Sequence, residues 1–159
     1  MDQKLLSIYL NDHLAGATVG IELARRTCSN NEGTDLGAFL VALIAEIESD
    51  REDLKALMEA LGCRKDVVKQ AGGWVAEKVG RLKLNGQLTG YSDLSRLEEL
   101  EGLCLGVEGK LSLWKSLKQI ENHDPRLVTF DLERLIKRAQ QQREELEEHR
   151  IQAAEQAFS

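Results

Sequence analysis

Apolar residues in the second quarter of the chain recur with alternating spacings of four and three, the pattern of a helix that packs along its whole length. The residues of this row are Leu36, Leu40, Leu43, Ile47, Asp50, Leu54, Leu57 and Leu61. Only Asp50 among them is polar. Thr34 stands where an N-cap is expected, and Gly62 follows the last leucine as a C-terminal cap. The pattern predicts a helix over residues 34–61, about 42 Å long at 1.5 Å per residue, which needs partners of similar length.

The same periodicity predicts three further long helices, over residues 4–28, 93–122 and 125–157. Asp124 and Pro125 form a start signal for the last of them, with Asp as the N-cap and Pro as the first helical residue. The row expected to face the core from that helix is Val128, Leu132, Leu135, Ala139, Gln142, Leu146, His149 and Ala153.

A connection of roughly 30 residues separates the second and third long helices, and it contains a predicted short helix over residues 73–84. Such a connection is long enough to span a long helix and return the chain to the other end. Two long helices, a long crossover and two tightly joined helices make the ferritin-like up-down-down-up arrangement. We therefore predict an all-α four-helix bundle that forms a single domain over residues 1–159. An up-down-up-down bundle, with the short helix as a lid, is the alternative.

Composition agrees with a helical protein, because aromatic residues make up only 4% of the chain and it contains a single proline. The net charge of −6 disfavours a nucleic-acid surface. The longest uncharged apolar run, residues 36–45, is far short of the roughly 20 residues that a membrane span needs. Three cysteines without a CxxC pair agree with a reducing compartment. We expect a cytoplasmic protein that binds neither nucleic acid nor membrane.

Three glycines, Gly102, Gly106 and Gly109, share one side of the third long helix, opposite Cys104. Small residues allow another element to approach closely, and that element is either the crossover segment or a second copy of the chain. The stripe is therefore a candidate interface, and we expect the protein to form a homo-oligomer.

Several stretches resemble an uncharacterised bacterial family of ferritin-like proteins. They are residues 9–16 (YLNDHLAG), 21–26 (IELARR), 45–48 (AEIE), 73–78 (GWVAEK), 81–86 (RLKLNG) and 107–110 (VEGK). The resemblance covers nearly the whole chain and brings no known activity with it. Membership of the wider ferritin-like group implies a di-metal carboxylate centre holding iron or manganese.

Such a centre uses Glu-x-x-His pairs on two of the helices, and the chain contains none. The predicted topology nevertheless brings several acidic residues and one histidine to similar levels along the bundle. These candidate metal ligands are Glu22, Glu46, Glu108, Glu145 and His149. Glu22, Glu46 and Glu145 lie beside the core-facing rows rather than in them, which is the usual place of a solvated charge.

Asp50 and Gln142 do lie in core-facing rows, and their expected levels bring them within reach of each other. One interpretation is that they are hydrogen-bonded interior groups that fix the helix register. The other is a polar pocket in the core of the bundle. No phosphate loop or catalytic triad order is present. We therefore predict a non-catalytic bundle that acts through protein–protein surfaces. The alternatives are an iron or manganese site with redox or metal-handling activity, and a small-molecule pocket at Asp50 and Gln142.

Overall fold

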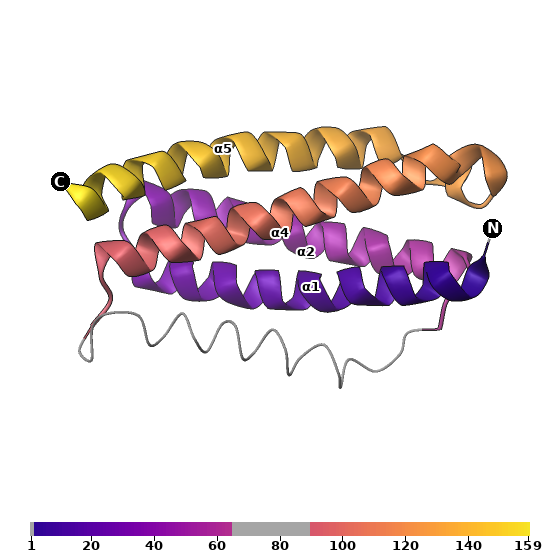
Figure 1. The fold of residues 1–159 in the computed structure, drawn as a ribbon, viewed down its shortest axis with the longest axis horizontal. Helices are drawn as coiled ribbons and strands as arrows, with labels where there is room; N and C mark the ends of the chain where they lie inside the picture. Colours follow the sequence, from indigo (N-terminus) through magenta and orange to yellow (C-terminus); the bar gives the residue numbers. More distant parts are fainter. Residues whose placement is uncertain (1, 65–89) are drawn as a thin grey trace.

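Four long helices lie side by side and form a bundle (Figure 1). The computed structural model describes residues 2–64 and 90–159, so the predicted short helix over 73–84 lies outside the described residues. The helices are α1 (Gln3–Asn30), α2 (Asp35–Ala60), α4 (Asp93–Ile120) and α5 (Leu132–Phe158). The predicted all-α four-helix bundle is confirmed.

Hydrogen bonds between helix ends fix the direction of each helix. Arg96, at the start of α4, donates to the side chain of Asn31 after α1 and to that of Gln156 near the end of α5, each at 2.8 Å. At the opposite end of the bundle, Gln3 of α1 donates to the carbonyl of Leu61 after α2 at 2.6 Å. Consequently α1 and α5 run in one direction and α2 and α4 in the other (Figure 1).

The two predicted caps of α2 are present, and α4 also has a side-chain cap at its start. The Thr34 hydroxyl accepts a hydrogen bond from the backbone N–H of Gly37 at 3.1 Å, and the Ser92 hydroxyl accepts one from that of Ser95 at 3.1 Å. Gly62 follows α2 with a φ of 67°, a left-handed conformation that glycine adopts without steric cost. Local sequence signals were sufficient at these ends.

The predicted start of the last helix was wrong. The helix begins at Leu132 rather than at Pro125, and Asp131 is its N-cap, accepting from the backbone N–H of Arg134 at 3.0 Å. Val128, which the pattern placed in the core-facing row of this helix, precedes the helix and is 63% exposed.

Two short 3₁₀ helices, η1 (Glu121–His123) and η2 (Leu127–Thr129), connect α4 to α5. The Asp124 carboxylate lies between them and accepts from both the backbone N–H and the guanidinium of Arg126. Asp124 therefore stabilises a turn rather than an α-helix. Leu127, fully buried, anchors this turn to the core.

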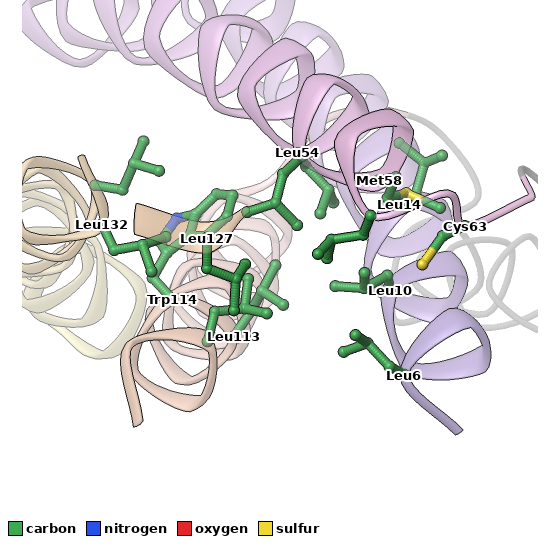
Figure 2. Close-up of a cluster of buried hydrophobic side chains, with 14 of the residues drawn as sticks. Leu6, Leu10, Leu14, Leu54, Met58, Cys63, Leu113, Trp114, Leu127 and Leu132 are labelled. Carbon is green, nitrogen blue, oxygen red and sulfur yellow. The ribbon is translucent and has the colours of Figure 1, made fainter. Parts of the chain in front are cut away.

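The apolar core consists of two clusters, one toward each end of the bundle. Trp114 extends from α4 into the cluster at the start of α1 (Figure 2). This first cluster includes Leu6, Leu10, Leu14, Leu54, Leu57, Met58, Leu111, Leu113, Leu127 and Leu132. The second includes Ile21, Leu40, Leu43, Ile47, Leu100, Leu103, Val107 and Leu146. Asp50 and Gln142 are buried at the level between the two clusters, with 2% and 1% of their surfaces exposed.

Candidate functional site

A buried carboxylate lies between two cations in the middle of the bundle. Asp50 of α2 accepts from the Lys110 ammonium of α4 at 2.5 Å through Oδ2, and from the Arg138 guanidinium of α5 through Oδ1. The side chains of the two cations are also mostly buried. Charges removed from water in this way are tolerated only when each is paired and hydrogen-bonded. Asp50 meets that condition through both of its oxygens.

Further hydrogen bonds extend this ionic group into a polar layer that spans α2, α4 and α5. The Lys110 ammonium also donates to the side-chain carbonyl of Gln142, whose amide in turn donates to Glu46 at 2.7 Å. Arg138 donates to Asp53 at 3.1 Å. Burial lowers the pKa of Lys110, and the neighbouring Asp50 carboxylate opposes that shift. The two residues predicted to come within reach of each other, Asp50 and Gln142, therefore both contact the same ammonium.

Sequence reasoning missed Lys110 and Arg138, although a signal was present. Lys110 lies in a row along α4 with the alternating spacing of four and three that marks a core-facing side: Leu103, Val107, Lys110, Trp114 and Leu117. Arg138 follows Leu135 by three residues and precedes Gln142 by four, so it shares a face with both. A charged residue inside such a row indicates an interior ionic group.

A cavity of about 220 Å³ lies between α1 and α4 and reaches the polar layer. It exists because both helices carry small residues at this level. The small residues that line it are Gly16, Ala17, Gly20, Gly102, Gly106 and Gly109. A Cβ added at Gly16, Gly20, Gly106 or Gly109 would have no described atom within 4 Å. The predicted interface stripe of α4 thus forms one wall of a pocket.

The walls of this pocket are mostly apolar, and its polar groups are few. Its large apolar lining residues are Ile47, Leu54, Leu103, Leu105, Val107, Leu113 and Trp114. The buried Asp50 and Lys110 line it as well, together with Arg51 of α2, and Asp12 and His13 line it from α1. Burial lowers the pKa of His13. An apolar pocket with a few convergent polar groups is the usual form of a small-molecule site.

Three of the predicted metal ligands lie apart from this layer and face solvent or neighbouring side chains. Glu22 is exposed. Glu108 is also exposed and lies 3.6 Å from the Arg143 guanidinium. Glu145 accepts a hydrogen bond from Gln141 at 2.8 Å. These contacts are typical of carboxylates on the outside of a bundle.

The other two candidate ligands are also engaged elsewhere. Glu46 accepts from Gln142 at the edge of the polar layer, and the His149 ring packs on Phe39 with 4.5 Å between the ring centroids. Among residues 2–64 and 90–159, no group of three or more His, Cys, Asp or Glu side chains could hold a metal ion. The described structure does not bring the five predicted ligands together.

A second buried polar cluster, which the sequence did not predict, joins the ends of α1 and α4. Glu99 is 5% exposed and accepts from Arg26 at 2.8 Å and from the Tyr91 hydroxyl at 3.0 Å. Asn31 also donates to that hydroxyl at 2.9 Å. Burial raises the pKa of Tyr91 to about 12, so the phenol stays protonated and able to donate. The cluster fixes the positions of the helix ends relative to each other.

The chain matches no protein-family model, no curated protein and no solved structure. In the described part of the chain, none of the helices combines the length and the apolar character needed to cross a bilayer.

Proposed function

We propose that this chain is a ferritin-like four-helix bundle that acts without catalysis, by binding a small molecule in the pocket between α1 and α4. The ferritin-like arrangement is supported by the helix directions, since α2 and α4 run the same way and a long connection joins them. An up-down-up-down bundle would need these two helices to run in opposite directions.

The main support for this proposal is a cavity with mostly apolar walls that is also lined by a buried ion pair. An empty apolar cavity of about 150 Å³ is large enough to bind benzene. The cavity here, about 220 Å³, suits a somewhat larger molecule. Both oxygens of Asp50 are already held by cations, which makes this carboxylate a poor general base and favours a binding role over a catalytic one.

Titration with toluene tests the pocket through Trp114, which lines it. The chain has two tryptophans, so Trp74→Phe leaves Trp114 as the sole indole reporter. We expect a saturable change in Trp114 emission. We also expect a rise in the midpoint of thermal unfolding, because a ligand that binds only the folded state stabilises it.

Filling the pocket should remove this response. Gly106→Leu places a side chain in the cavity, and an added Cβ there meets no described atom within 4 Å, so the fold should tolerate it. Gly20→Leu does the same from α1. The matched control is Ala38→Leu on the exposed face of α2, which should bind toluene like the parent chain. An unsaturable signal, or equal binding by all these variants, would refute the proposal.

A second candidate function is self-association through the same face. Leu105 is 75% exposed at the pocket, beside Gly106, so the leucine of one copy is placed to enter the glycine-lined groove of another. Sedimentation velocity at increasing concentration should then show a dimer that Leu105→Ser weakens by at least about tenfold in Kd, a loss of about 1.4 kcal/mol. A parent chain that stays monomeric at high concentration would exclude it.

A further inference from the structure

Where the pocket meets the polar layer, the hydrogen-bonding capacity that is left over belongs to a cation. The Lys110 ammonium has three N–H donors, and two of them are directed to Asp50 and Gln142. One donor remains. The Asp50 carboxylate, by contrast, is already engaged through both oxygens. The charged group best able to accept a new partner at the polar layer is therefore Lys110.

Arg51 adds a second cation with unused donors. Its Nε atom is buried and makes no hydrogen bond with any described residue, and its nearest carboxylate, Glu52, is 3.5 Å away. The Arg51 side chain as a whole is 24% exposed and lines the cavity, so its guanidinium can turn toward a ligand there. Both cations line the same cavity, whose other lining residues are apolar or glycine except Asp50, already held by its cations, and Asp12 and His13 on the α1 side. The pocket is thus complementary to an anion that carries an apolar body.

We propose that the pocket binds a small monocarboxylic acid as its anion, with the carboxylate at Lys110 and Arg51 and the apolar body against the glycine-lined walls. Charge-assisted hydrogen bonds of this type are roughly twice as strong as neutral ones. The acid must also be compact. A molecule of about ten non-hydrogen atoms is in proportion to the cavity, given that about 150 Å³ holds benzene. This inference rests on the proposed function and adds the chemical class of the ligand.

Three compounds of nearly equal shape and different charge separate the ligand class from the existence of the pocket. They are phenylacetate, phenylacetamide and phenethylammonium, titrated at pH 7 into the full chain carrying Trp74→Phe, with toluene as the reference. We expect phenylacetate to bind at least about tenfold more tightly than phenylacetamide, which is 1.4 kcal/mol. Phenethylammonium should bind more weakly than both.

Variants at the two cations should remove the preference for the anion and leave toluene binding in place. Arg51→Gln should reduce the acid-to-amide ratio several-fold, and Lys110→Met should bring it close to one. Lys110 also pairs with the buried Asp50, so Lys110→Met can destabilise the fold. If that variant does not fold, Arg51→Gln alone decides the outcome. Arg143→Gln, at an exposed arginine that does not line this pocket, is the matched control and should keep the parent ratio.

These measurements distinguish an error in the proposed ligand class from the absence of a binding pocket. If toluene binds and the acid and amide bind equally, or the ammonium binds most tightly, the carboxylate proposal is overturned and the pocket stands. If neither toluene nor phenylacetate binds, both proposals are overturned. A preference for the acid that survives in both Arg51→Gln and Lys110→Met would place the anion elsewhere and overturn the assignment.

Discussion

Replacing Asp50 by alanine should lower the free energy of unfolding by about 3–5 kcal/mol, because it leaves buried cations without their shared carboxylate. Asp50 is 2% exposed and accepts from both Lys110 and Arg138. Water cannot readily replace the lost acceptor at this depth. Urea unfolding followed by far-UV circular dichroism measures the change.

The matched control is Asp53→Ala, which removes a carboxylate that also accepts from Arg138. The Asp53 side chain is 31% exposed and pairs with Arg134 and Arg138 at 3.2 and 3.1 Å. Water screens such a pair, so this variant should lose no more than about 1 kcal/mol. Equal losses for the two variants would show that Asp50 is not a buried ionic centre.

Removing the whole ionic layer should cost much less than removing Asp50 alone. In the triple variant Asp50→Leu, Lys110→Met and Arg138→Met, no charge is left unpaired and the desolvation penalty disappears. Such replacements are often neutral or stabilising by about 1–4 kcal/mol. The side-chain carbonyl of Gln142 loses its Lys110 donor, so we expect this variant to be more stable than Asp50→Ala without exceeding the parent chain, and to lose the preference for phenylacetate over phenylacetamide. Stability near that of Asp50→Ala would contradict this explanation.

Trp114→Ala should have an effect of similar size for a different reason. Trp114 is 1% exposed and packs in the first apolar cluster (Figure 2). Truncating a buried aromatic residue typically costs about 3–5 kcal/mol through lost contacts and the space left behind. Because Trp114 also lines the pocket, the same change should enlarge the cavity. Chemical denaturation measures the first effect, and binding of naphthalene relative to toluene, followed by thermal shift, measures the second.

Trp114→Phe separates the packing of the indole from its polarity. The indole Nε1 atom is buried and has no hydrogen-bond partner among the described residues. The phenylalanine variant therefore loses volume and no hydrogen bond, so we expect a cost of roughly half that of Trp114→Ala or less. A cost equal to that of the alanine variant would mean that Nε1 makes an interaction on which the cluster depends.

Hydrophobic periodicity predicted the four long helices well, because each must cover one face of a shared core over its full length. The alternating row from Leu40 to Leu61 is buried almost throughout, including its single polar member, Asp50. Axial level could also be estimated, since a helix rises by a fixed distance per residue. That regularity is why Asp50 and Gln142 were expected at one level, and both contact Lys110.

Long charged side chains were the main source of what the sequence did not predict. Lys110, Arg138 and Arg51 have flexible stems that let the charged head either enter the core or reach solvent, so the position of the residue on its helix does not by itself decide between the two. The predicted start of α5 was wrong for a different reason. Asp124 and Asp131 are both plausible N-caps, and the fully buried Leu127 holds a turn between them that local signals do not encode.

The predicted metal ligands were expected at similar positions along the bundle axis, but they do not lie together. The direction in which each side chain leaves its helix matters as much as its position along the axis. Glu22 and Glu108 are exposed, although the sequence predicted that they lie at a similar level along the bundle. His149 lies against Phe39 in the half of the bundle that holds the second cluster. A small deviation in helix rotation separates an interior carboxylate from an exposed one.

The most direct test of the pocket between α1 and α4 is an NMR measurement of contacts between toluene and the labelled methyl groups of isoleucine, leucine and valine. We expect intermolecular nuclear Overhauser effects from toluene to Ile47, Leu103 and Val107, which line the cavity and are buried. Gly106→Leu should abolish them. Effects confined to exposed methyl groups such as those of Val41, which is 62% exposed, would contradict toluene binding in this pocket, as would their complete absence at saturating toluene.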